Sequence, residues 1–350
     1  MLKKLLQPKQ KPLLGLDIGT RFVKAVLLNH SNGVFEITDA ACEPILGEAF
    51  AEREVKDFDA ISHCIKKVKH RLKLKNKEVS VAVSGTSVLT KKVYMLPNQT
   101  DAELEAQIEL EADSLIPFPL EDVYIDFEKL GTQTDERDDV LLSVAHKNMI
   151  DSRITLLREL EFEPKIIDIE GFALGNALQH FRQSTSGQAI ACFNIGATQL
   201  QLTVIDENQE MHSKELPFGT DHLIKDICLF HGLDQNTAIQ QLKDQTLPET
   251  WRNDAYPHFL GNLQQSFNKV MQLYTGSSHK DAPKTLLLSG GGTLIEGLVS
   301  DLSTDMNKQF EVFNPFTLLS KNAPHIDRQS GPIYAIAVGL ACRSTQSCHT

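Results

Sequence analysis

The 350-residue sequence has few cysteines, few aromatic residues and no long apolar segment. Its six cysteines are scattered and form no CxxC pair, which disfavours a zinc site, a redox motif or a disulfide framework. No apolar run reaches the roughly 20 residues that cross a bilayer. The opening residues, MLKKLLQPKQKP, lack the apolar core of a signal peptide, so we expect the protein to stay in the compartment where it is made.

Basic residues are fewer than acidic ones, with 35 lysines and arginines against 46 aspartates and glutamates. The formal net charge of −11 argues against general nucleic-acid binding. The N-terminal lysines Lys3, Lys4, Lys9 and Lys11 form a local basic cluster, which we interpret as a solvated tail in preference to a weak membrane-surface contact. A second basic run, over residues 66–77, is typical of the exposed face and end of a helix.

An internal repeat is the most informative feature of the sequence. Residues 14–28 read LGLDIGTRFVKAVLL, and residues 191–205 read ACFNIGATQLQLTVI, so that Asp17 aligns with Asn194. Each copy is an apolar segment, a Gly-containing turn, and a segment in which apolar residues alternate with more polar ones. A period of two predicts a β-hairpin with one buried face in each copy.

The two copies lie about half the chain apart, and further apolar and helical segments follow each of them. Length alone predicts two domains. We therefore expect two related α/β domains that face each other across a cleft. Tight Gly turns present backbone N–H groups to anions, so turns at Gly19 and Gly196 suit a polyphosphate bound between them.

A third glycine signal lies in residues 286–298, LLLSGGGTLIEGL. The pattern predicts an apolar strand, a turn at Gly290, Gly291 and Gly292, and then the start of a helix. Glycines there let a ligand approach the backbone closely, and a helix N-terminus favours negative charge. A tight turn without a ligand is the alternative, but the two hairpins favour ligand contact.

The segment between the repeats predicts a small α/β insertion. Thr100 and Glu103 have the spacing of a capping box at the start of an acidic helix, whose carboxylates we interpret as a solvated face and not as a metal site. The expected elements are one or two strands in 79–96, the helix from Thr100 to about 115, a strand over 123–130, a polar loop over 132–139, a strand over 140–145 and a helix over 147–160.

Five motifs in this order, LGLDIGTRFVKAVLL, QIELEADSLIPF, DIEGFALGNAL, FNIGATQLQLTVI and LLLSGGGTLIEGL, followed by YAIAVGLACR, resemble the PilM family of type IV pilus assembly proteins. The resemblance spans about residues 12–343, and actin-like proteins of mannose-sensitive pilus biogenesis are similar as well. It implies an α/β, actin-like (ribonuclease H-like, duplicated) two-domain ATPase fold related to FtsA. The expected parts are domain 1 over 12–187 with an insert at about 88–165, domain 2 over 188–343 with a closing helix that returns to domain 1, and tails at 1–11 and 344–350.

The resemblance also implies a site for ATP or ADP with Mg²⁺. Asp17 matches the acidic residue that organises Mg²⁺ through water, Gly19 and Thr20 match the phosphate turn, and Lys24 matches a lysine that reaches the phosphates. Glu170 matches a glutamate that orients metal and attacking water, with a helix N-terminal acid as its alternative role.

In the second half, the implied nucleotide contacts are Gly196, Ala197 and Thr198 at the second turn, Gly290, Gly291 and Gly292 at the adenosine turn, and Lys243 beside adenine or ribose.

Several residues depart from the family pattern. Asn194 stands where an Asp is common, and an amide is neither a carboxylate ligand nor a base. Arg21 and Phe22 replace small residues after the first turn, and Ile239 falls where a ribose-contacting Glu is expected. We therefore expect ATP binding with slow or absent hydrolysis.

The function implied by the resemblance is that of a cytoplasmic scaffold, peripheral at the inner membrane. Such proteins bind the cytoplasmic N-terminal peptide of a PilN-type membrane protein in a groove between the first domain and its inserted subdomain, and other pilus alignment proteins indirectly. An active ATPase or sugar kinase of the same fold is one alternative, and an FtsA-like filament protein is another. The chain ends in polar STQSCHT, without the amphipathic helix of FtsA.

Overall fold

The computed structural model of the protein describes residues 13–31, 34–51, 54–74, 76–85, 88–134, 137–181, 187–318 and 326–345. The N-terminal lysines Lys3, Lys4, Lys9 and Lys11 lie outside these residues. No helix in the described part of the chain combines the length and the hydropathy that a bilayer span requires.

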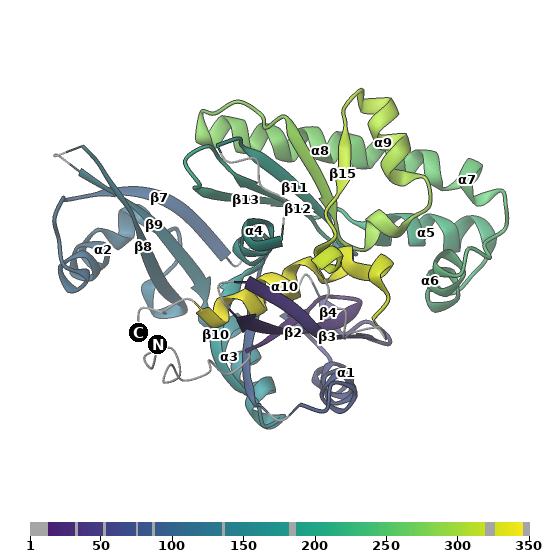
Figure 1. The fold of residues 1–350 in the computed structure, drawn as a ribbon, viewed down its shortest axis with the longest axis horizontal. Helices are drawn as coiled ribbons and strands as arrows, with labels where there is room; N and C mark the ends of the chain where they lie inside the picture. Colours follow the sequence, from purple (N-terminus) through teal and green to yellow (C-terminus); the bar gives the residue numbers. More distant parts are fainter. Residues whose placement is uncertain are drawn as a thin grey trace, which may run out of the picture.

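Two five-stranded sheets with the same topology form the framework of the molecule (Figure 1). In each, an antiparallel meander of three strands is extended by two parallel strands. The first sheet has the order β10-β6-β1-β2-β3 and the second β13-β12-β11-β14-β15. Their strands are β1 (Leu14–Ile18), β2 (Phe22–Ser31), β3 (Val34–Pro44), β6 (Glu78–Val83), β10 (Glu163–Ile169), β11 (Ile190–Ile195), β12 (Leu200–Ile205), β13 (Met211–Leu216), β14 (Thr285–Ser289) and β15 (Phe310–Val312).

The predicted hairpins are confirmed as β1–β2 and β11–β12. Both strands that open a repeat lie in the middle of a sheet that helices cover on both faces, which is why they are apolar almost throughout. The registers agree with the aligned repeat. Asp17 lies opposite Lys24 in the first hairpin, and Asn194 lies opposite Gln201 in the second.

The segment between β6 and β10 forms a three-stranded sheet of order β7-β9-β8 with its own small apolar core. The capping box of Thr100 and Glu103 is confirmed. The predicted loop over 132–139 is wrong, because cross-strand pairing continues through these polar residues and leaves a much shorter connection. The elements are β7 (Val88–Met95), α2 (Asp101–Leu115), η2 (Leu120–Asp122), β8 (Val123–Thr134), β9 (Arg137–His146) and α3 (Lys147–Glu159).

Helices cover the outer faces of both sheets, and two helices lie between the sheets (Figure 1). The outer helices are α1 (Phe58–Arg71), α5 (Thr220–His231), α6 (Gln235–Lys243), α7 (Trp251–Asp254), α8 (Tyr256–Ser278) and α9 (Leu298–Met306), and the central pair is α4 (Glu170–Phe181) and α10 (Ala335–Cys342). Short elements are β4 (Phe50–Ala51), β5 (Glu54–Val55), η3 (Gly291–Leu294), η4 (Pro315–Leu318), η5 (Arg328–Tyr334) and η6 (Arg343–Thr345).

The central helices pack on each other so closely that only glycine fits at the crossing. A Cβ atom at Gly339 of α10 would overlap the carbonyl oxygen of Ala173 in α4. A Cβ atom at Gly15 of β1 would likewise overlap the carbonyl oxygen of Ala337. The two helices share one apolar core with strands of both sheets, so this crossing joins the two halves of the molecule.

We predict that Gly339→Ala lowers the free energy of unfolding by about 3 kcal/mol or more, because backbone atoms of α4 must move to admit the methyl group. Gly261→Ala is the matched control, since Gly261 lies within α8 with open space around it and gains helix propensity of about 1 kcal/mol. Urea unfolding of both variants is the measurement. A midpoint for Gly339→Ala equal to that of the wild type would contradict the account of the crossing.

Candidate functional site

The candidate site lies at the carboxyl ends of the parallel strands. In the first sheet these ends lead into residues 19–21, which we call turn 1, into Ser84 and into Glu170. In the second sheet they lead into residues 196–199, which we call turn 2, and into Gly290. Ligands of open α/β sheets bind at this edge, because strand ends and helix N-termini point there.

Turn 1 is built around a buried ion pair. The Gly19 N–H donates to the carbonyl of Phe22 at 3.1 Å, which closes the turn. Beneath it, Lys24 Nζ lies 2.5 Å from Asp17 Oδ2, and both groups are largely buried. Burial alone would lower the pKa of Lys24, but the Asp17 carboxylate raises it above its usual value. Lys24 therefore holds a full positive charge directly beside Gly19.

Turn 2 repeats the backbone of turn 1 without its charges. The Gly196 N–H donates to the carbonyl of Gln199 at 2.9 Å. Asn194, at the place of Asp17, accepts a hydrogen bond from Ser289 Oγ at 3.2 Å, and its cross-strand neighbour Gln201 is neutral. The duplication therefore preserved the fold of the turn but left a carboxylate and an ammonium group in the first copy alone.

The third glycine turn packs against turn 2. Gly290 has φ = 85°, a conformation that favours glycine, and its N–H donates to the carbonyl of Pro332 at 3.0 Å. A Cβ atom there would come within 2.5 Å of the Ile195 carbonyl oxygen and 2.6 Å of Asn194 Oδ1. Gly291 faces open space. The predicted strand–turn–helix order is confirmed, and close packing alone already requires glycine at position 290.

The two turns contact each other. Thr20 Oγ1 and Thr198 Oγ1 lie 3.3 Å apart. Arg21 crosses from turn 1 to Asp221 in the first turn of α5, with Nε 3.1 and 3.2 Å from the two carboxylate oxygens and a terminal nitrogen 2.8 Å from Oδ2. The residues expected to hold phosphates thus come together, and Asp221 is a site residue that the sequence did not indicate.

Arg153 is a second residue that the sequence did not indicate. It is buried on α3, and its guanidinium donates to the carbonyl of Ile18 at 3.4 Å, just before turn 1. Its partner is 135 residues away, and an arginine within a helix is an ordinary sequence feature. The contact ties the helix that follows the small sheet to the base of turn 1.

Glu170 and Lys243 each lie close enough to the first hairpin and its neighbour β3 to act on them electrostatically. Glu170 is the buried first residue of α4, and its charge contributes to the raised pKa of Lys24. Burial raises the pKa of Cys42, the cross-strand neighbour of Lys24, to about 11, whereas Lys24 and Lys243 act in the opposite direction. Ile239 packs against the apolar core of the second half.

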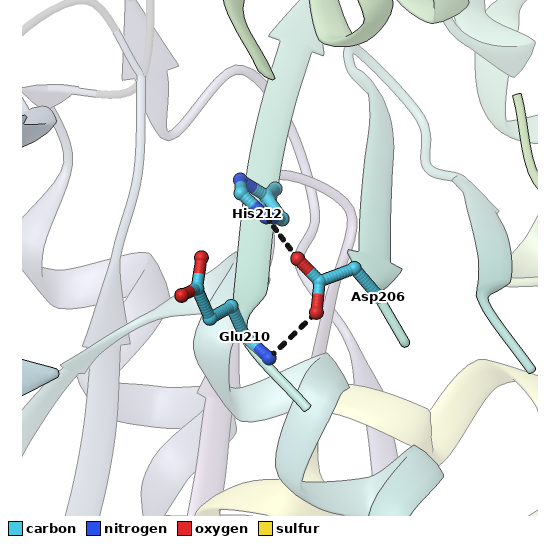
Figure 2. Close-up of side chains that lie close together, drawn as sticks. All are labelled: Asp206, Glu210 and His212. Atoms are coloured by element: carbon cyan, nitrogen blue, oxygen red, sulfur yellow. Dashed lines mark hydrogen bonds and ion pairs between the residues drawn. The ribbon is translucent and has the colours of Figure 1, made fainter. Parts of the chain in front are cut away.

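One group of ligand-type side chains in the described part of the chain has metal-like spacing: Asp206, Glu210 and His212 (Figure 2). His212 Nε2 lies 3.0 Å from Asp206 Oδ2, and the Glu210 N–H donates to Asp206 Oδ1 at 3.0 Å. These residues surround the β12–β13 connection, at the end of β12 opposite to turn 2.

Two lysines make this group an ion-pair network. Lys280 Nζ contacts Asp206 Oδ2 directly, and Lys92 Nζ of β7 lies 3.4 Å from Glu210 and 2.7 Å from Asp139 of β9. Burial alone would raise the pKa of Asp206, but Lys280 and His212 hold it below its usual value. The network joins the small three-stranded sheet to the second half of the molecule.

Comparison with known proteins gives a consistent result. A family model described as type IV pilus assembly protein PilM matches residues 15–345. The structure is similar to a solved PilM-PilN type IV pilus biogenesis complex, with a TM-score of 0.83, 22% identity and coverage of 97% of this chain and 100% of that chain. It is also similar to ethanolamine utilization protein EutJ from Carboxydothermus hydrogenoformans, with a TM-score of 0.60, 13% identity and coverage of 98% of this chain and 93% of that chain. A third similar structure is a diol dehydratase-reactivating factor in nucleotide free form, with a TM-score of 0.52, 9% identity and coverage of 94% of this chain and 98% of that chain.

These similarities, together with the two sheets of identical topology, confirm the expected α/β class and the two-domain, actin-like fold.

We predict that Asp206→Asn lowers the free energy of unfolding by about 2 kcal/mol at pH 7, because the partly exposed Lys280 loses its nearest charged partner and keeps only Glu210, at 3.9 Å. The pKa of Asp206 is depressed in the folded protein, so its contribution is present above the unfolded value near 4 and is lost as the pH falls through the lower folded value. Thermal unfolding from pH 7 to pH 3 should show the two proteins converging. Glu207→Gln, at the exposed neighbouring position, should match the wild type throughout.

Proposed function

Because the chain belongs to the PilM family of type IV pilus assembly proteins, we propose that it is a nucleotide-binding scaffold of this assembly that holds the cytoplasmic N-terminal peptide of a PilN-type membrane protein. The observation that supports nucleotide binding is the contact between the two similar hairpin turns, with the Lys24 side chain in an ion pair at the base of turn 1. An ATPase or sugar kinase, or an FtsA-like filament protein, is less well supported by the family match.

In the proposed complex, the phosphates of ATP or ADP contact Gly19, Thr20 and Lys24 on one side and Gly196, Ala197 and Thr198 on the other. The turn of Gly290, Gly291 and Gly292 and the side chain of Lys243 receive adenosine. Glycine backbone at these positions lets phosphate oxygens approach N–H groups, and Lys24 offsets their charge.

Mg²⁺ fits the first half of this site. Asp17 Oδ2 is engaged by Lys24, and Asp17 Oδ1 lies on the side of Gly19, with Glu170 in the same electrostatic environment. These carboxylates would hold the ion through water, and the ion would offset phosphate charge. Asn194 adds neither a carboxylate ligand nor a base, which supports slow or absent hydrolysis.

The partner follows from the similarity to a PilM-PilN complex. A hollow of about 370 Å³ lies in the small sheet region, between β7 and the end of α2, and its lining includes Leu89, Lys91, Leu115 and Ile116. In the described part of the chain β7 pairs with β9 alone, so one of its edges is free of strand pairing. The lining also includes Asp113, Ser114 and Pro117, so the hollow is partly apolar and partly polar. An edge strand beside such a hollow suits an extended peptide, with main-chain bonds for affinity and pockets for side chains.

The same proposal covers domain organisation and location. Domain 1 would span 12–187, with the peptide-binding insert at about 88–165, and domain 2 would span 188–343. The protein would be cytoplasmic and reach the inner membrane through its PilN-type partner, with other pilus alignment proteins bound indirectly. Binding of the peptide to purified protein in the absence of membranes tests the partner contact.

Isothermal titration of Mg-ATP and Mg-ADP should show binding, and Asp17→Asn should weaken it by at least about tenfold, or 1.4 kcal/mol, because Lys24 and the metal lose a charged partner. Asp59→Asn, an exposed change of equal charge on α1, should bind like the wild type. Phosphate release in the same samples should be slow or undetectable. No heat at millimolar nucleotide, or turnover of several per second, would contradict the corresponding part of the proposal.

Fluorescence anisotropy of a synthetic peptide from the N-terminus of the PilN-type protein encoded alongside should show binding in moderate salt, since apolar contacts are weakly screened. Leu89→Asn should weaken binding by about tenfold, or 1.4 kcal/mol, because it removes an apolar side chain from the hollow. Leu229→Asn, at an exposed leucine of α5, is the matched control. Equal affinity of both variants would place the peptide elsewhere.

A further inference from the structure

The contact between Arg21 and Asp221 closes the candidate site between the two turns. Arg21 belongs to turn 1, and Asp221 belongs to α5, whose first amides hold turn 2. The Thr220 N–H donates to the Gly196 carbonyl at 3.0 Å, and the Asp221 N–H donates to the Ala197 carbonyl at 2.8 Å. The Arg21–Asp221 pair therefore links turn 1 to the helix that holds turn 2.

Both partners of this pair are shielded from solvent. The side chains of Arg21 and Asp221 are 15% and 11% exposed. A guanidinium group that makes three hydrogen bonds to one carboxylate is well oriented, and removing one partner of a shielded pair leaves an uncompensated charge. The pair is therefore stable while nothing else competes for either group.

The two turns also touch through their threonine hydroxyls. Thr20 Oγ1 and Thr198 Oγ1 are within hydrogen-bond distance, so no atom can lie between them. A polyphosphate held by both turns must separate these hydroxyls, and the Arg21–Asp221 contact spans the same gap. Phosphate entry and this contact therefore oppose each other.

We propose that Arg21 and Asp221 form a clasp across the two turns, and that the phosphate groups of a nucleotide compete with Asp221 for the guanidinium of Arg21. This inference rests on the proposed nucleotide binding and adds Arg21 to the residues that contact phosphate. A guanidinium fork matches phosphate oxygens as well as it matches carboxylate oxygens, and a phosphate group carries at least as much charge. Asp221 acts as the competitor that phosphate must displace.

Isothermal titration of the full-length protein with Mg-ATP, and separately with inorganic tripolyphosphate, tests the clasp. Asp221→Asn should bind each ligand about tenfold tighter than the wild type, because a neutral amide holds Arg21 less strongly. Arg21→Gln should bind about tenfold more weakly, and the double variant should bind like Arg21→Gln, since no guanidinium remains to be released. Arg21→Lys, which keeps the charge but not the fork, replaces Arg21→Gln if that variant unfolds.

Asp226→Asn is the matched control, because it removes the same charge from the same helix outside the clasp, and its affinity should equal that of the wild type. If the wild type binds nucleotide and Asp221→Asn binds equally or more weakly, the clasp is refuted and the nucleotide function stands. If the wild type fails to bind and Asp221→Asn binds, the clasp is the barrier. If neither folded protein binds, both proposals are overturned.

Discussion

The backbone-to-backbone contact of α4 and α10 is the constraint on which the rest of the structure depends. Gly339 rests on the carbonyl of Ala173, and Gly15 of β1 rests on the carbonyl of Ala337, so β1, α10 and α4 approach as closely as backbones can. Core residues from both sheets surround these helices. Because turn 1 directly follows β1, and Glu170 is the first residue of α4, the packing of this layer sets where the first half of the site lies.

The duplicated halves share a topology but divide the chemistry unequally. The pairs Asp17–Lys24 and Asn194–Gln201 occupy the same cross-strand position, yet only the first is charged. The fold requires a tight turn in both copies, and glycine supplies it in both. It does not require charge, so the second copy is free to hold its turn with a neutral hydrogen bond from Ser289.

The sequence predicted those parts of the structure that depend on neighbouring residues. The hairpins follow from period-two alternation around Gly19 and Gly196, and the start of α2 follows from Thr100 and Glu103 three residues apart. The prediction of a loop over 132–139 was wrong, because the pairing of β8 with β9 continues into these polar residues and depends on contacts that are not local in sequence. Arg21–Asp221 and Arg153–Ile18 span 200 and 135 residues, and no pattern within one segment indicates such contacts.

The proposed clasp and the proposed metal both affect the charge that a polyphosphate would meet at the two turns. Around the two turns the described residues carry charges of both signs, among them the cationic Arg21, Lys24 and Arg153 and the carboxylates Asp17, Glu170, Glu215 and Asp221. A polyphosphate that binds there adds negative charge in a region partly shielded from water, where uncompensated charge is costly. Two changes would offset the added negative charge: a cation bound beside Asp17, and release of the Arg21 guanidinium from Asp221. Asn194 places a neutral amide where the family pattern has a carboxylate, so the carboxylates that remain beside turn 2 are Glu215, which Gln199 contacts, and Asp221.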